Sequence, residues 1–336
     1  MSSTVSTQSQ PDAIGTVLAL VQPGLTRVHS SLGQLAETDD AILAPMLSAV
    51  LPGSGKRLRP ALALLIGRMS AGATVDVDAD ALNQMAVGVE LLHTASLVHD
   101  DIVDESDTRR GGATLYARVG NALAVLVGDY LFSQAAQACV ATGNLEVVRL
   151  FAETLGAMAQ GQIDDANRAL GGRHSWESLS RDRYYRTIGG KTASLFVLAC
   201  QGTGQLVGLS AAQIAALRVY GENLGLAFQV FDDILDFTAT EEELGKPVGS
   251  DLRQGTITLP VILMRDVADG RFRAAFETED VDLQVRLVQE SGAIPLALSE
   301  AEALVARARG ALTEFSPSTE RDALDALAAF VTHRDR

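Results

Sequence analysis

Two clusters of aspartate residues are the part of this sequence best suited to chemistry. Residues 100–104 and residues 232–236 both follow the pattern Asp-Asp-x-x-Asp, and each cluster ends an apolar run with helical spacing. In a helix, residues four apart lie on one face, about 6 Å apart along the axis. The first and last aspartates of each cluster therefore point the same way.

Like charges at this spacing predict a cation between them, because burying two carboxylates among apolar helices is costly unless a cation shares the site. Carboxylates without Cys or His neighbours suit a hard cation, and Mg²⁺ completes its shell with water and phosphate oxygen. The candidate metal ligands are Asp100, Asp104, Asp232 and Asp236, with Asp233 beside them. A single acidic cluster more often marks a solvated helix end, but the duplication favours a metal site.

Basic residues close to the first cluster and to a glycine turn supply candidate contacts for phosphate. Arg109 and Arg110 follow the first cluster within a few residues, so guanidinium groups for phosphate adjoin carboxylates for metal. Residues 53–60 place Lys56 and Arg59 beside a glycine turn at a predicted helix start, where backbone N–H groups also suit an anion. The glycine spacing is not that of a P-loop, and a merely basic helix start is the alternative.

Two later segments have similar features. Residues 189–192, Gly-Gly-Lys-Thr, predict a helix that opens after a glycine break, with Lys191 as a point charge for phosphate. The polar loop 241–251 follows the second cluster, carries Lys246 and is placed to close over a charged ligand.

Two more polar residues share a face with the aspartates. His93 lies two helical turns before Asp100, and Gln229 lies three residues before Asp232. A lone histidine in a helix is more often a core residue, so the shared face leaves both roles open for His93. The other acidic runs lack this spacing and are interpreted as solvated: Asp164-Asp165 and Glu241 to Glu243.

The rest of the chain predicts a helical scaffold. Apolar residues recur at intervals of three and four, and no stretch alternates with period two, so the fold class is all-α. Residues 1–12 are rich in Ser, Thr and Gln and predict a disordered tail, whereas residues 13–336 show no shift in composition and predict one helical bundle domain. One long helix is expected over 79–104. Predicted breaks include Gly189-Gly190, Gly202 to Ser210 and Thr238 to Gly255.

Composition limits the partners. With 42 acidic against 27 basic residues and a net charge of −15, the chain argues against nucleic acid and anionic membrane surfaces. Cys139 and Cys200 lack metal or redox spacing, so both are expected as reduced thiols in the core. No apolar run is expected to span a bilayer, and no leader is evident at the start, so we expect a cytoplasmic protein.

Together, these motifs resemble the trans-isoprenyl diphosphate synthases, the polyprenyl synthetase family, over about residues 40 to 270. The matching motifs, in chain order, are Gly55 to Pro60, His93, Asp100 to Arg110, Gly128-Asp129-Tyr130, Gly190-Lys191-Thr192, Gln229 to Asp236 and Gly245-Lys246. The resemblance implies an all-α bundle around a deep central cavity, normally a homodimer, with three Mg²⁺ ions in each active site.

The resemblance also implies a role for each site residue. Isopentenyl diphosphate would be held by Lys56, Arg59, His93 and Arg110. The allylic diphosphate would be held by Mg²⁺ on Asp100 and Asp104 and gripped by Arg109, Lys191, Thr192, Gln229 and Lys246. The remaining metal would bind Asp232, with Asp233 and Asp236 behind it. The expected catalytic set is therefore Asp100, Asp104, Lys191, Asp232 and Asp233.

The chemistry implied by these parts is a prenyl transfer. Metal and cations would stabilise the departing diphosphate, an allylic carbocation would form, and the double bond of isopentenyl diphosphate would attack it. No dedicated base stands out, which leaves the released diphosphate to take the proton. One departure from the family pattern is that Gln254 and Thr256 stand where an acid and a second lysine are common.

Product length is expected to depend on the helix leading into Asp100. Ser96, Leu92, Gly88 and Ala95 fall within one stripe of about 100° on this helix. Short-chain members of the family carry large aromatic residues at the positions of Ala95 and Ser96, so the small residues here predict a C30 to C50 product of the kind used for quinone side chains. The alternatives are a C20 geranylgeranyl diphosphate synthase, a class I terpene cyclase and a non-catalytic synthase subunit.

Overall fold

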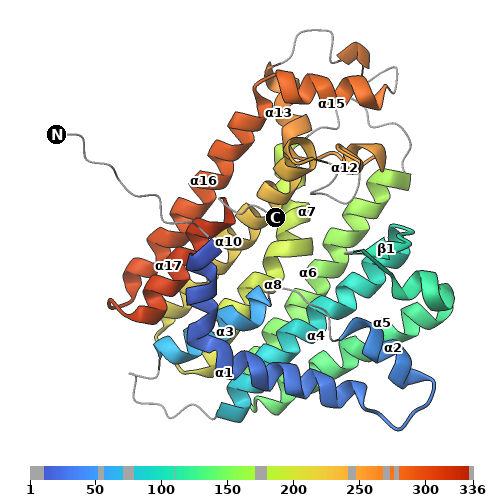
Figure 1. The fold of residues 1–336 in the computed structure, drawn as a ribbon. Helices are drawn as coiled ribbons and strands as arrows, with labels where there is room; N and C mark the ends of the chain where they lie inside the picture. Colours follow the sequence, from blue (N-terminus) through green and yellow to red (C-terminus); the bar gives the residue numbers. More distant parts are fainter. Residues whose placement is uncertain are drawn as a thin grey trace.

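Helices make up nearly all of the chain that the computed structural model describes (Figure 1). The structure describes residues 11–51, 57–70, 79–109, 111–170, 180–240, 247–267, 273–275 and 280–332. The predicted site residues Lys56, Arg110 and Lys246 and the acidic run 241–243 lie outside these ranges. Residues 1–10 lie outside them as well, so the division into a tail and one domain stays a prediction.

The all-α prediction is confirmed. The first half of the chain contains α1 (Pro11–Ala36), α2 (Leu43–Val50), α3 (Leu58–Met69), α4 (Ala79–Val103), α5 (Leu115–Ala141) and α6 (Leu145–Leu170). The second half contains α7 (Arg181–Ile188), η2 (Gly189–Ala193), α8 (Ser194–Val197), η3 (Leu198–Gly202), α9 (Thr203–Leu206), α10 (Ala211–Thr238), α12 (Ser250–Arg253), α13 (Leu259–Val267), α15 (Val281–Glu290), α16 (Ala293–Ala311), η4 (Leu312–Glu314) and α17 (Thr319–Val331). Among the described residues the strands are β1 (Thr108–Arg109) and β2 (Gly112–Ala113), a short antiparallel pair just after α4.

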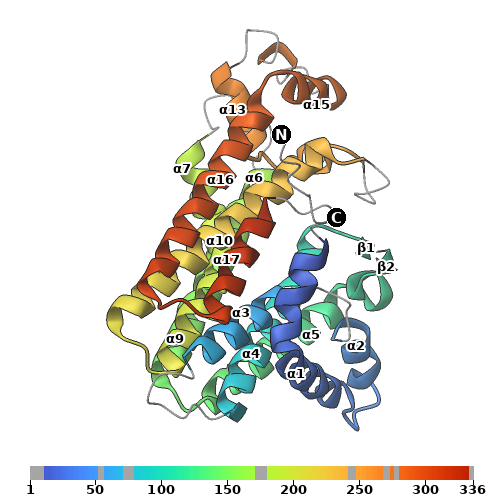
Figure 2. The same cartoon turned by 60° about the vertical axis from the view of Figure 1, so that its left-hand side comes forward.

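Two helix pairs frame the bundle. α4 packs along α5, and α10 packs along α16, as both ribbon views show (Figures 1 and 2). The expected helix over 79–104 is confirmed as α4. α10 begins where Ser210 and Gln213 form a reciprocal capping box. Because each of these two long helices ends at one of the aspartate clusters, their packing decides where the clusters lie.

The central run from α7 to α9 corrects the prediction of a break at Gly189-Gly190. Helix continues through this point as the π-helical turn η2 and ends only after Leu206, so the predicted break at Gly202 also comes too early. The short helix α12 likewise lies inside the predicted break over 238–255. The glycines serve close packing instead of a break.

Glycines bring this central run into backbone contact with helices on both sides. A Cβ on Gly190 would lie 2.5 Å from the carbonyl oxygen of Ala157 in α6, and one on Gly161 would lie 2.5 Å from the backbone nitrogen of Lys191. On the other side, a Cβ on Gly221 of α10 would lie 2.7 Å from the carbonyl oxygen of Phe196. Only glycine allows such approach, so the run is held tightly between α6 and α10.

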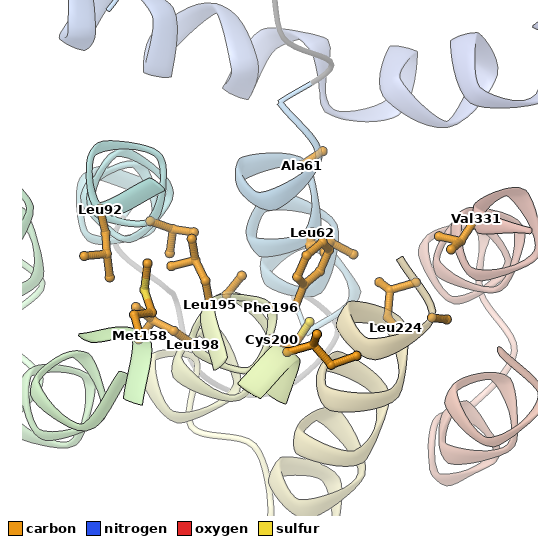
Figure 3. Close-up of a cluster of buried hydrophobic side chains, with 14 of the residues drawn as sticks. Ala61, Leu62, Leu92, Met158, Leu195, Phe196, Leu198, Cys200, Leu224 and Val331 are labelled. Carbon is orange, nitrogen blue, oxygen red and sulfur yellow. The ribbon is translucent and has the colours of Figure 1, made fainter. Parts of the chain in front are cut away.

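The core is apolar and contains both cysteines. Cys139 and Cys200 are fully buried free thiols, as expected. Figure 3 shows a cluster in which Leu92 of α4 points toward Met158, Leu195 and Leu198, and Phe196 lies beside Leu62.

One helix departs from the expectation that no apolar run could span a bilayer. By length and composition alone, α5 is long and apolar enough to cross a membrane. In the structure, 39% of its most apolar window is buried. It packs along α4, and a core helix of a folded bundle has the same composition. Its outer face still carries Leu123, Val125 and Leu126, which are 40%, 39% and 62% exposed.

Replacing Gly221 by Ala should destabilise the fold, because the added methyl would meet the Phe196 backbone, which cannot move aside. We expect a loss of about 1–3 kcal/mol in the free energy of unfolding, the usual cost of overpacking. The matched control is Gly156→Ala in α6, where a Cβ would meet nothing within 4 Å. That variant should gain about 0.5–1 kcal/mol from helix propensity. Urea unfolding of both variants tests the contrast, and equal effects would contradict the packing role.

Candidate active site

The first aspartate cluster lies at the C-terminal end of α4, where its members face two directions. Asp100 is partly buried and Asp104 is exposed, while Asp101 is only 6% exposed. Asp101 accepts a 2.7 Å hydrogen bond from Nε of Arg109 in β1. Arg109, predicted to grip a diphosphate, is thus hydrogen-bonded to Asp101, and its charge also stabilises the ionised forms of Asp100 and Asp104.

Lys191 supplies the positive charge next to Asp100 and Asp104. Its Nζ donates a 2.8 Å bond to Oδ2 of Asp165 on α6, and it lies close enough to Asp100 and Asp104 to stabilise both carboxylates electrostatically. The interpretation of Asp165 as solvated was therefore wrong, since its side chain is 19% exposed and ion-paired. The acidic pair Asp164-Asp165 carries no sequence signal of this role, because the pairing depends on how α6 packs on η2.

The protonation equilibria show how strongly the site is charged. Burial raises the pKa of Asp100 to about 6, with Lys191 acting against the rise and Asp104 adding to it. Limited hydration also raises the pKa of Asp104, again against the effect of Lys191. Burial acts to lower the pKa of Lys191, but Asp100, Asp165 and Asp104 outweigh it, so the pKa of Lys191 is raised. Three carboxylates thus keep one ammonium group charged, and the cluster has negative charge left over for a further cation.

The second cluster, at the end of α10, is more deeply buried. Asp232 is partly exposed, whereas Asp233 and Asp236 are 3% and 1% exposed. Asp233 accepts hydrogen bonds from the Tyr184 hydroxyl at 2.6 Å and from Nε2 of Gln229 at 2.8 Å. Burial raises the pKa of Asp233 well above its usual value, with nearby Asp251 contributing and these two hydrogen bonds opposing. Asp232 is therefore the group of this cluster that water and a ligand can reach most readily.

Asp236 has a structural contact as well as its predicted metal role. Its Oδ2 accepts a 3.1 Å bond from the backbone N–H of Asp251, and its carbonyl oxygen accepts one from Gly249 at 2.8 Å. These bonds hold the start of α12 against the end of α10.

The two clusters are connected through η2. Lys191 faces the first cluster, and the hydroxyl of the next residue, Thr192, donates a 2.8 Å bond to Oε1 of Gln229, which in turn bonds Asp233. Of two adjacent residues on one helical turn, Lys191 thus acts on the first cluster, and Thr192 is linked to the second cluster through Gln229. This chain of contacts links the two clusters across the helices between them.

A pocket of about 350 Å³ opens beside the first cluster. It is lined by Val103, Asp104, Glu105, Gln162, Asp165, Ala166, Gln254 and Thr256. The two residues that depart from the family pattern, Gln254 and Thr256, therefore stand at the same opening as the carboxylates Asp104 and Asp165. Thr256 stands where the resembling family commonly has a lysine, and it therefore contributes a neutral hydroxyl to the lining of this acidic pocket.

The donor set fits Mg²⁺ shared with a phosphate. Among the described residues, no group of three or more Asp, Glu, His or Cys side chains forms a closed metal cage. Mg²⁺ keeps several waters and takes one or two carboxylates with substrate phosphate oxygens. Asp100, Asp104 and Asp232 offer oxygen ligands of this kind and leave the remaining positions to a ligand.

Of the residues predicted to hold isopentenyl diphosphate, the structure describes Arg59 on α3 and His93 on α4. The guanidinium carbon of Arg59 lies 4.6 Å from the ring centroid of buried Phe196, a cation–π contact that fixes it at the first turn of α3. His93 is partly buried on α4. His99, next to Asp100, packs on Gly128 of α5, where a Cβ would lie 2.3 Å from its Nε2. The motif glycine thus allows α4 and α5 to approach next to the site.

The predicted tail-facing stripe needs one correction. A Cβ on Gly88 would lie 3.0 Å from Sγ of Cys139 and 3.4 Å from Cβ of Ala138, so Gly88 faces α5 and not the interior. Ala95 is fully buried and within about 20° of the same bearing, so it borders the α5 contact. Leu92 points toward the inside, and the hydroxyl of Ser96 donates to the carbonyl oxygen of His93 at 2.8 Å.

Comparison with known proteins agrees with this geometry. The model of the polyprenyl synthetase family matches residues 40–283. The chain belongs to the polyprenyl synthetase family. It is 33% identical over 327 residues to the octaprenyl diphosphate synthase of Escherichia coli, with 94% of this chain and 98% of that protein covered.

Solved structures of the family have the same fold. The polyprenyl synthase of Caulobacter crescentus, complexed with calcium and isoprenyl diphosphate, superposes with a TM-score of 0.87 at 32% identity and covers 96% of this chain and 98% of its own. The decaprenyl diphosphate synthase of Rhodobacter capsulatus gives 0.85 at 31% identity, covering 96% and 99%. The predicted enzyme class, a prenyltransferase of the polyprenyl diphosphate synthase type, is confirmed, as is the metal dependence of the family.

In metal-free protein, Asp100→Asn should raise stability at neutral pH. The folded pKa of about 6 lies above the unfolded value near 3.8, so ionised Asp100 destabilises the fold once the pH exceeds that range. The gain should be absent below about pH 4 and reach about 1–3 kcal/mol above pH 7. Urea unfolding in a chelator across this range measures it.

The control for this prediction is Asp39→Asn, at an exposed position remote from the site in sequence. It should show no such pH-dependent difference from wild type. A stability gain for Asp100→Asn that persists unchanged at pH 4 would contradict the assignment to Asp100 ionisation.

Proposed function

We propose that this prenyltransferase condenses isopentenyl diphosphate head-to-tail onto allylic diphosphates and makes an all-trans polyprenyl diphosphate of C30–C50 for quinone side chains. The observation that carries the proposal is the convergence of Asp100, Asp104 and Asp165 on Lys191, one residue from Thr192, which is linked to the second cluster through Gln229. The printed names of the relatives, octaprenyl and decaprenyl diphosphate synthases, support a long product.

The allylic diphosphate binds at the mouth of the pocket in this proposal. Asp100 and Asp104 on one side and Asp232, with Asp236 behind it, on the other would hold Mg²⁺, three ions in each site, which would supply positive charge to stabilise the departing diphosphate. Lys191 leaves Asp165 to contact the same phosphates, which bring the negative charge that Asp165 supplies in the ligand-free state. Arg109, Thr192, Gln229 and Lys246 complete the contacts to the allylic diphosphate.

Isopentenyl diphosphate occupies the cationic side of the site. Arg59, oriented by the Phe196 ring, binds its phosphates with Lys56, His93 and Arg110. The apolar interior beneath Asp100 excludes water from the carbocation. Asp233, bonded by Tyr184 and Gln229, is placed to fix Gln229 and hence Thr192.

The competing assignments differ in what they need from these residues. A C20 geranylgeranyl product requires a floor close to Ser96, which a neighbouring helix would have to provide. A class I terpene cyclase has no use for the cation Arg59, which is held against the Phe196 ring. A non-catalytic subunit would erode the aspartates, and both clusters are intact here.

We also propose a cytoplasmic homodimer in which the α5 faces of two copies meet. The exposed residues Leu123, Val125 and Leu126 form an apolar stripe on α5, and covering it with a second copy removes this surface from water. Sedimentation that finds only monomers at micromolar concentration, or fractionation that finds the protein in membranes, would contradict this part of the proposal.

Incubating the purified protein with Mg²⁺, isopentenyl diphosphate and farnesyl diphosphate, then sizing the dephosphorylated products by mass spectrometry, tests the function. We expect polyprenols of C30–C50. Asp100→Ala and Asp232→Ala should each lower turnover by roughly 10²-fold or more, the scale of losing electrostatic stabilisation of a transition state.

The matched control is Asp39→Ala, which should keep wild-type turnover. A cyclic or hydrolysed product would favour the terpene cyclase, and a single C20 product would favour the geranylgeranyl synthase. Near-normal turnover in either aspartate variant would contradict the two-cluster mechanism.

A further inference from the structure

The proposed function leaves open what ends the growth of the hydrocarbon tail, and the packing beneath Asp100 bears on this. The diphosphate end is anchored at the C-terminal end of α4, so the tail must enter the apolar interior to leave water. On α4, the residues within about 80° of the bearing of Asp100 on the interior side are Ser96, Leu92, Val89 and Met85. They define the wall along which the tail runs.

The α5 side of α4 offers no path. Gly88 lies in close contact with Ala135, Ala138 and Cys139 of α5, and His99 lies against Gly128. The tail is therefore directed to the adjacent face of α4, where α4 packs on η3 and η3 packs on α6.

Apolar side chains fill this space in an upper layer. Leu92, about 12 Å below Asp100, points toward Met158 of α6 and toward Leu195 and Leu198 of the central run (Figure 3). All four are buried, with Met158 at 7% exposure. Met158 is an unbranched, adaptable side chain, so this layer can rearrange around a growing tail.

A deeper layer is more firmly held. The Cε of Met85, about 22 Å below Asp100, lies 2.8 Å from the point where a Cβ on Gly202 would stand. Leu198 and Leu150 surround the same point at 3.4 Å and 3.7 Å. Met85 is fully buried, and its end rests on the bare backbone of Gly202 between side chains from α6 and η3.

We propose that Met85, resting on Gly202, is the residue that closes the deep end of the tail path and sets the maximum product length, which places the product at the short end of the proposed C30–C50 range. The inference rests on the proposed function, because it assumes that the chain makes a polyprenyl product. The absence of a side chain at Gly202 is what gives Met85 its present position. Changes at the two residues should therefore move product length in opposite directions.

The test is product length in two variants. Met85→Ala opens the floor and should lengthen the longest product by at least one isoprene unit. Gly202→Ala puts a methyl where the end of Met85 lies, displaces that flexible end into the path and should shorten the product. In the double variant the methyl has room, so its products should be longer than those of Gly202→Ala alone.

The matched control is Leu91→Ala, which creates a cavity on α4 one residue from Leu92 but about 100° around the helix. Its product length should equal that of wild type. If Met85→Ala is too unstable to assay, Met85→Val shortens the side chain with less loss of volume and should shift length in the same direction.

The outcomes separate the two hypotheses. If wild type makes polyprenyl products and both Met85→Ala and Gly202→Ala keep its length distribution, Met85 is not the floor and this inference is overturned. If Leu91→Ala lengthens the product as much as Met85→Ala, the effect is general loosening and the inference is also overturned. If wild type makes no polyprenyl product at all, the proposed function itself fails.

Discussion

The partial compensation of three carboxylates by one ammonium group is the interaction on which the rest of the site depends. Asp100 lies at the C-terminal end of α4 and Asp104 directly follows it. Asp165 comes from α6, and Lys191 comes from the π-helical turn η2. Their convergence requires α6 and η2 to touch through backbone, which Gly161 and Gly190 allow. Side chains at those positions would separate the helices and leave buried carboxylates without a cation, a costly arrangement.

In the proposed function, this arrangement lets one surface bind a metal ion and a diphosphate together. In the ligand-free state Lys191 lies against Asp165 at 2.8 Å, and the carboxylates retain excess negative charge that favours a cation. A metal-bound diphosphate would bring positive and negative charge to the site together. Lys191 could then exchange a carboxylate for a phosphate without losing its ion pair. The buried chain from Thr192 through Gln229 to Asp233 keeps the second cluster aligned with this exchange.

The sequence was informative where chemistry has a fixed spacing along one helix. The two Asp-Asp-x-x-Asp clusters, the helix before Asp100 and the family followed from local pattern. Asp165 was missed because its role arises from packing between helices far apart in the chain. The pair Gly189-Gly190 led to the prediction of a helix break. In a sequence, a glycine that ends a helix cannot be told from a glycine that lets two helix backbones pack closely. Gly88 was placed on the wrong face because helical bearing alone does not tell which neighbour lies there.

The most direct test of the central claim is a calorimetric titration of Mg²⁺ into metal-free protein, with and without inorganic diphosphate, for wild type and Lys191→Met. If Lys191 neutralises the carboxylates in the ligand-free state, the variant should bind Mg²⁺ about tenfold or more tightly than wild type without diphosphate, the scale of one neighbouring charge. Adding diphosphate should favour wild type, whose ammonium group contacts the phosphates. Equal or weaker Mg²⁺ binding by Lys191→Met in the absence of diphosphate would contradict the account.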